Sequence, residues 1–208
     1  LYDDGFQVRE GAAISLVSLS RSGVSLDSAV EPLISVLDDD CRNARQAVIK
    51  ALGEIGDERA TEPLIAVLDD DTIQDCWRTR GDAMDALAKI GDKLGVETLI
   101  DMLSSDVTRD RVSSARALGN VDGEHQVKPL ISSLRFDEDD WVRRLAAKSL
   151  GKIGGEYAVD ALTIASQIDE EEEVRRESRV ALKLISRLNK EKHEEAEGPS
   201  DSSSIQRD

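Results

Sequence analysis

The sequence is poor in aromatic residues, cysteine and histidine, and each scarcity narrows the possible folds and sites. Aromatic residues make up 3% of the chain, so a hydrophobic core must come from Leu, Ile, Val and Ala. Such a core suits thin helices packed side by side and suits a large ligand pocket poorly. The two cysteines, Cys41 and Cys76, belong to no CxxC pair and no Cys/His cluster. We expect free thiols in a reducing compartment, and no zinc site.

Long apolar runs and a surplus of positive charge are also missing. Because no apolar run approaches the length of a membrane span and no signal peptide is apparent, we expect a soluble, cytoplasmic protein. Acidic residues outnumber basic ones 43 to 27, the formal net charge is -16, and no basic stripe offsets the acid. We therefore do not expect a nucleic-acid partner. Two explanations of the acidity stay open, a salt-adapted cytosol and a merely acidic soluble protein.

What the sequence does have is internal repetition, with a period of 31 to 36 residues. When the units are aligned on one leucine, a small residue precedes it and a branched aliphatic residue follows three positions later. An arginine stands seven positions before each leucine, and an acid stands five positions before each arginine. The leucines are Leu16, Leu52, Leu87, Leu118, Leu150 and Leu182. The arginines are Arg9, Arg45, Arg80, Arg111, Arg143 and Arg175. The acids are Asp4, Asp40, Asp75, Asp106, Glu138 and Glu170.

Each unit predicts two amphipathic helices joined by a turn. Apolar residues recur at helical spacing, and the small residue before each leucine should let neighbouring helices approach closely. Gly56 and Gly91 follow the first helix, where glycine forms a left-handed C-cap most easily. The acids before each first helix are expected to cap it. Pro32, Pro63 and Pro129 fall in the first turn of the second helices, where proline is tolerated.

The units define one repeat domain and a tail. They span about 4–40, 40–71, 75–106, 106–136 and 138–168, followed by a first helix alone over 170–188. We therefore predict an all-α fold over 1–188, an α-solenoid of about five and a half helical hairpins. Residues 189–208 are charged and then rich in Gly, Pro and Ser, which predicts a disordered acidic tail.

The repeat resembles the short HEAT-like repeats of the phycobilisome-lyase (PBS lyase) type over about residues 4–188. The resemblance is clearest in KALGEIGDERATEPLIAVLDDD, in SARALGNVDG and in AAKSLGKIGG. It implies an α-solenoid in which the second helices line the concave side. Because repeats of this kind serve many unrelated roles, the resemblance alone selects no function.

Three groups of residues are candidates for function. The first lies on the second helices, where it forms either a mostly acidic groove for a basic segment or a solvated face, and we favour the solvated face. The second is a pair of tryptophans, Trp77 and Trp141, which either anchor a partner or cover the turns between units, and we favour the turns. The third is the arginine column, which we interpret as a structural ladder rather than a recognition site because acids accompany it. The second-helix group comprises Glu31, Glu62, Ala66, Glu97, Asp101, Lys128, Ser132 and Asp160.

Enzymatic activity is not expected. The diiron hydroxylase that modifies a lysine-derived residue has repeats of similar length, but it needs several His-Glu pairs, and the only one here is His193–Glu194. His125, which follows Glu124 near the start of a second helix, is interpreted as a surface histidine rather than a general acid or base. The sequence contains no P-loop or dinucleotide motif. We expect no cofactor or metal. The prediction is a monomeric, non-catalytic scaffold whose concave face binds a protein partner, with a basic partner among the candidates. The alternative is a lyase-like accessory subunit for a tetrapyrrole or a protein modification.

Overall fold

The computed structural model describes residues 5–70 and 77–197, and every regular element in these two ranges is a helix. The first helices of the units are α1 (Phe6–Arg21), α3 (Arg42–Ile55), α5 (Trp77–Ile90), α7 (Thr108–Leu118), α9 (Asp140–Ile153) and α11 (Glu172–Glu197). The second helices are α2 (Val30–Ile34), α4 (Thr61–Asp69), α6 (Lys93–Met102), α8 (Val127–Phe136) and α10 (Glu156–Ile168). Two short 3-10 helices, η1 (Asp27–Ala29) and η2 (Glu58–Ala60), lead into α2 and α4. This order confirms the predicted solenoid of five hairpins and a final single helix.

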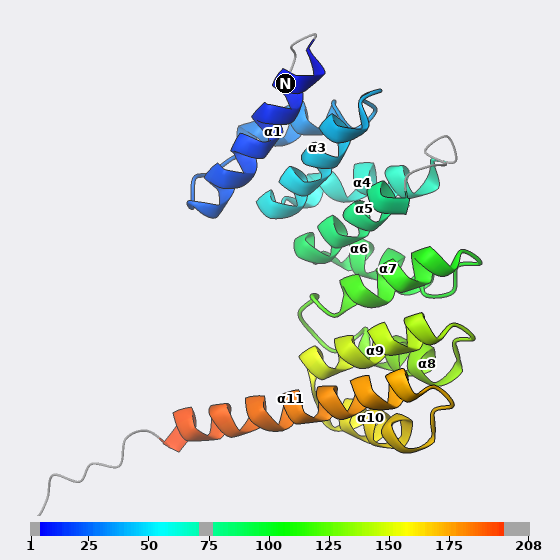
Figure 1. Ribbon diagram of the computed structural model, residues 1–208. Helices are drawn as coiled ribbons and strands as arrows, with labels where there is room; N and C mark the ends of the chain where they lie inside the picture. Colours follow the sequence, from blue (N-terminus) through cyan, green and yellow to red (C-terminus); the bar gives the residue numbers. More distant parts are fainter. Residues whose placement is uncertain (1–4, 71–76, 198–208) are drawn as a thin grey trace, which may run out of the picture.

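The first helices lie side by side in chain order, and the second helices form a layer behind them (Figure 1). The repeated leucines lie between the two layers. Four of them are completely buried, namely Leu52, Leu87, Leu118 and Leu150, whereas Leu16 and Leu182 at the two ends of the stack are only partly buried. Because each unit covers only its neighbours, burial is complete only where neighbours stand on both sides.

Small residues bring neighbouring first helices into close contact, as the repeat pattern predicts. A Cβ atom added at Gly53 would lie 2.7 Å from the Cα of Ala86 on the next first helix. Between α9 and α11, a Cβ atom at Gly151 would lie 2.6 Å from the Cβ of Ala181. The backbones therefore touch at these crossings, which fixes the spacing of the first-helix layer.

The turns within units follow the predicted chemistry more closely than the turns between units. Gly56 ends α3 at a φ of 74°, in the left-handed region that glycine tolerates best. Asp92 caps α6 by accepting a hydrogen bond from the backbone N–H of Gly95. Before the first helices, Asp139 caps α9 as expected, but α3 begins after Cys41 without a side-chain cap. The predicted acidic capping therefore holds at α9 and fails at α1, α3 and α7.

The last helix corrects the predicted boundary at residue 188. Helix α11 continues to Glu197, through the segment that the sequence analysis assigned to the tail. The reason is local, because KEKHEEAE consists mainly of strong helix formers. An ion pair of 2.8 Å between Arg187 and Glu191, one turn apart, adds support. The remainder of the predicted tail, 198–208, lies outside the described residues.

Candidate functional site

Four of the six column arginines form a row of ion pairs between successive units. The Nε of Arg111 donates to Asp137 at 2.9 Å, and a second guanidinium nitrogen donates to the other carboxylate oxygen at 3.2 Å. Arg143 repeats this fork with Asp169 at 3.0 and 3.1 Å. The side chains of Arg111 and Arg143 are only 9% and 6% exposed. The same kind of pair joins Arg9 to Asp39 and Arg80 to Asp110.

Arg111 and Arg143 also hold the turns that precede their own helices. Arg111 donates to the carbonyl of Ser105 at 3.0 Å, and Arg143 donates to the carbonyl of Asp137 at 3.0 Å. Asp137 thus receives one arginine at its carboxylate and the next at its carbonyl. The main partner stands one position before the predicted acid, since Glu138 contacts Arg111 only at 3.3 Å and stays 86% exposed. These contacts favour the structural interpretation of the column.

The eight residues proposed on the second helices all have exposed side chains. Glu31 contacts Arg59 at 3.5 Å, an exposed pair of little energetic weight. Asp101 and Ser132 line a groove of about 410 Å³ between α6 and α8. The exposed residues are Glu31, Glu62, Ala66, Glu97, Asp101, Lys128, Ser132 and Asp160.

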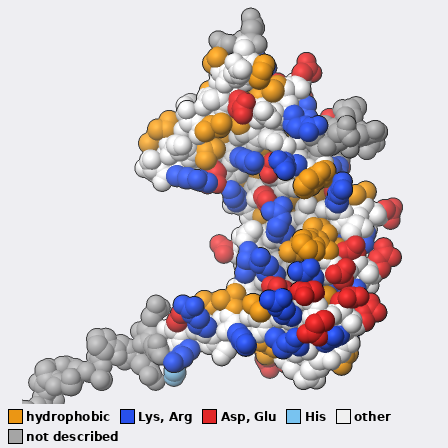
Figure 2. All heavy atoms as spheres, viewed as in Figure 1, with side chains coloured by type: hydrophobic (Ala, Val, Ile, Leu, Met, Phe, Trp, Pro, Cys, Tyr) orange, Lys and Arg blue, Asp and Glu red, His pale blue; other side chains and the backbone are white. Residues whose placement is uncertain are grey.

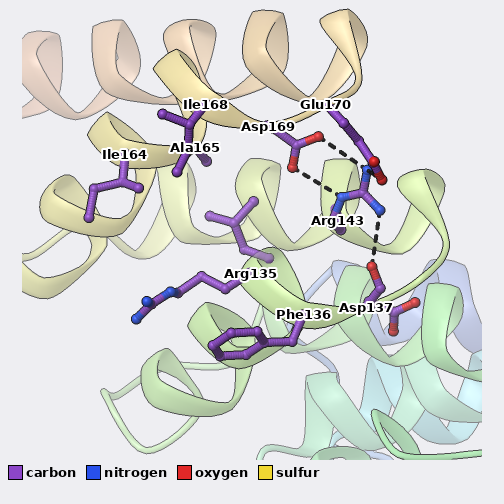
Figure 3. A pocket seen from close by; sticks show the side chains of 10 residues that line it. Arg135, Phe136, Asp137, Arg143, Ile164, Ala165, Ile168, Asp169 and Glu170 are labelled. Atoms are coloured by element: carbon purple, nitrogen blue, oxygen red, sulfur yellow. Dashed lines mark hydrogen bonds and ion pairs between the residues drawn. The ribbon is translucent and has the colours of Figure 1, made fainter.

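A second groove, of about 440 Å³, lies between α8 and α10 and meets the first at Phe136. In Figure 3, Ile164 and Ile168 of α10 stand on one side of this groove, and Phe136 of α8 stands on the other. The pair between Arg143 and Asp169 lies at one end (Figure 3). Phe136 is 72% exposed and Ile168 is 74% exposed, so the groove presents large apolar side chains to water.

These apolar residues are not among the sequence-predicted site residues, because the repeat register gives no clear signal for them. Phe136 and Ile168 stand seven positions before Arg143 and Arg175. At the same position the other units have Tyr2, Asp38, Ile73 and Ser104. Polar and apolar residues are mixed in this column, so only the structure shows that two of them are exposed beside a groove.

On the opposite layer, Trp77 and Trp141 are 54% and 50% exposed. The guanidiniums of Arg78 and Arg109 lie 5.6 and 5.5 Å from the ring centre of Trp77. The guanidinium of Arg144 lies 4.7 Å from that of Trp141. About half of each tryptophan therefore stays exposed to solvent beside an arginine, so neither side chain is buried against a turn between units.

Positive charge gathers on this first-helix face, contrary to the expectation that no basic stripe exists. Figure 2 shows Lys and Arg side chains spread across the face, with apolar groups between them and acids concentrated along one edge. Cations from separate units come together in clefts: Lys50 of α3 and Lys89 of α5 line one cleft, and Lys148 of α9 lines another. They adjoin only after the units stack, which is why the linear sequence does not show the stripe.

Towards the C-terminal ends of the first helices, cations are paired with acids in a cleft of about 410 Å³. Glu54 contacts Arg21 at 2.8 Å and Lys89 at 2.6 Å, which ties α1, α3 and α5 together. Hydrogen bonds from these two cations lower the pKa of Glu54 to about 2. Burial raises the pKa of Asp82, although Lys50 lies 3.4 Å away. Charges in this cleft are largely satisfied within the protein.

The groups that commonly carry catalysis are sparse in the described part of the chain. In the ranges 5–70 and 77–197, no cluster of three or more His, Cys, Asp or Glu residues is placed to hold a metal ion. Cys41 is a half-buried free thiol, His125 is exposed before α8, and Cys76 lies outside the described residues. None of the described helices is both long enough and apolar enough to cross a membrane.

Several solved structures are similar to this chain over most of its length. An engineered protein superposes with a TM-score of 0.52 at 21% identity, over 90% of this chain and 94% of that one. Human deoxyhypusine hydroxylase in complex with glycerol gives 0.49 at 21% identity, over 89% and 82% of the two chains. The complex of CpcE and CpcF of phycocyanin lyase from Nostoc sp. PCC7120 gives 0.46 at 19%, over 90% and 91%. At these identities the likeness concerns the fold alone.

The comparison with protein families is more decisive. No curated protein sequence matches this chain. The family model for HEAT repeats matches residues 1–76 and 96–183, which together make up most of the sequence. The matched ranges contain five of the six ladder arginines and both inter-unit turns that Arg111 and Arg143 clamp. This protein therefore belongs to the HEAT-repeat family.

Proposed function

We propose that this protein is a non-catalytic scaffold that binds a protein partner along the second-helix face. The observation that carries the proposal is the groove system across α6, α8 and α10, in which Phe136 and Ile168 are more than 70% exposed. Contiguous apolar surface of this kind marks interaction sites, because a partner that covers it removes apolar area from water.

Charged residues near the groove indicate the chemistry of the partner. Glu170, which lines the groove, and Glu138, which follows the lining residue Asp137, are 79% and 86% exposed, although each touches a ladder arginine at 3.3 Å. These acids favour a segment in which apolar residues are flanked by basic ones. The groove walls are held by the buried pair of Arg143 and Asp169, so little order has to be imposed when a partner binds.

The test replaces the two most exposed apolar side chains together, as Phe136→Ser and Ile168→Ser. Immobilised wild-type and variant proteins are used to capture partners from a lysate of the native host at native salt, and captured proteins are quantified by mass spectrometry. We expect the double variant to lose specific partners by tenfold or more, since exposed anchors carry most of the binding energy. The matched control is Tyr157→Ser, because Tyr157 is 70% exposed on α10 and does not line either groove.

Thermal unfolding of both variants should stay close to that of the wild type, because surface side chains contribute little to stability. Equal capture of the same proteins by wild type and double variant would contradict the groove as the binding surface. A bound chromophore with visible absorbance, in the absence of any protein partner, would replace the scaffold by the lyase-like accessory role.

A further inference from the structure

We propose that the first-helix face carries a second docking surface, which binds an acidic segment of a protein. This surface, the tryptophan–arginine row, consists of Trp77, Arg78, Arg109, Trp141 and Arg144. It lies on α5, α7 and α9, in the layer opposite to the grooves between the second helices. The proposal therefore stands independently of the groove.

The geometry of the row leaves the arginines ready for an external acid. Arg78 and Arg109 approach Trp77 from two successive first helices, and Arg144 lies over Trp141. A guanidinium that rests its face on an aromatic ring keeps its N–H edge for hydrogen bonds. That edge matches the two oxygens of a carboxylate.

These arginines also lack the carboxylate partners that most other arginines have. Within the described residues, Arg78, Arg109 and Arg144 form no ion pair, and the Nε of Arg144 is buried without a hydrogen-bond partner. The chain has a net charge of -16, so carboxylates are abundant on its own surface. Arginines that remain unpaired at exposed tryptophans in such a protein are best satisfied by acids from another molecule. Arginines that are paired include Arg9, Arg21, Arg59, Arg80, Arg111, Arg116, Arg143, Arg175, Arg176, Arg179 and Arg187.

Two features favour a protein segment over a nucleic acid. A cleft of about 150 Å³ beside Trp141 and Arg144 has room for a single side chain, and it is also lined by Leu145, Lys148 and Glu177. Asp139 and Asp140 come directly before Trp141, so a long phosphate backbone would meet negative charge next to the row. Individual carboxylates of a short segment can meet the arginines and avoid these acids.

The chain contains only two tryptophans, and both lie in the row. Intrinsic tryptophan emission of the full chain therefore reports on this surface alone. The probe is a short Glu-rich peptide without tryptophan, compared with a Lys-rich peptide of equal length and with oligo-dT. We expect the Glu-rich peptide to change the emission saturably and to bind more weakly as salt rises. No response to that peptide, or a response to oligo-dT at equal or lower concentration, would overturn the proposal.

Substitutions locate the site. We expect Arg109→Gln combined with Arg144→Gln to weaken peptide binding roughly tenfold, since each arginine supplies charge-assisted hydrogen bonds. The control is Arg42→Gln, because Arg42 is exposed at the start of α3 and has no aromatic contact or ion pair with the described residues. Circular dichroism verifies that all variants are folded. Unchanged affinity in the double variant, or equal losses in the double variant and the control, would show that the row is not the binding surface.

Discussion

At the scale of single residues, the buried ladder arginines are the positions where a substitution costs most. Removing the side chain of Arg111 leaves the carboxylate of Asp137, which is 7% exposed, without a buried cation, and the carbonyl of Ser105 without its donor. Deleting one member of a buried ion pair is strongly destabilising, because the remaining charge stays away from water. We expect Arg111→Ala to lower the free energy of unfolding by about 3 kcal/mol, as measured by urea denaturation.

Two further variants separate geometry from charge. Arg111→Lys keeps the charge but cannot reach both Asp137 and Ser105, so its stability should fall between those of the wild type and the alanine variant. Arg78→Ala removes an exposed arginine of the same face and should change stability by no more than about 0.5 kcal/mol. If Arg111→Ala unfolded at the same urea concentration as the wild type, the ladder would carry no stability.

Single residues also differ in how well the sequence predicts their contacts. Repetition identified the arginine column, because six identical positions need a common cause. It misplaced the main acid by one position, from Asp137 to Glu138, because the direction of a side chain in a turn depends on backbone geometry. The contact of Arg109 with Trp77 joins two units and could not be read from either unit alone. The exposure of Phe136 has no signal in its repeat column, because polar and apolar residues are mixed there.

At the scale of elements, the crossings of first helices depend on the smallest residues. A Cβ atom at Gly53 would meet the backbone Cα of Ala86 at 2.7 Å, so α3 and α5 must move apart to accept it. We expect Gly53→Ala to destabilise the protein by about 1–3 kcal/mol, the usual cost of overpacking. Urea denaturation followed by circular dichroism measures the loss.

The control for this crossing is Gly11→Ala in α1, where an added Cβ atom would meet nothing within 4 Å. Alanine is the better helix former, so this variant should gain roughly 0.5–1 kcal/mol. A loss of stability in Gly53→Ala together with a gain in Gly11→Ala would show that the loss comes from the close spacing of α3 and α5. A gain in both would show that the α3–α5 crossing tolerates a wider separation.

The helices themselves were the most predictable elements, since periodic apolar residues and glycine C-caps define them locally. The end of α11 was less predictable, because a charged segment with high helix propensity can continue a helix or remain disordered. The grooves between second helices were not predictable at all. They depend on how far apart α6, α8 and α10 stand, which the packing of the other layer decides.

At the scale of the whole molecule, charge is segregated by location. Cations spread over the first-helix face, and acids cluster in the turns between units, including residues 38–40, 137–140 and 169–173. These turns succeed one another along the stack, so they repel one another while the protein is folded. Salt screens this repulsion more than it weakens the buried pairs of the ladder.

We therefore expect added salt to stabilise the protein. Raising NaCl from about 0.05 M to about 0.5 M should raise Tm by roughly 2–5 °C, as measured by circular dichroism. A neutral solute at equal osmolality serves as the control and should give a smaller change. A lower Tm at high salt would mean that exposed ion pairs outweigh the repulsion between turns.

The double use of each turn by the ladder has a consequence for how such a chain can change its length. Asp137 is held by Arg111 from the preceding unit and by Arg143 from its own unit. Asp39 and Asp169 are held in the same double way. A unit that lies between two such turns carries one outgoing arginine and one receiving turn. Duplication or loss of that unit would leave the remaining junctions complete, whereas insertion of a few residues within a turn would break two connections at once.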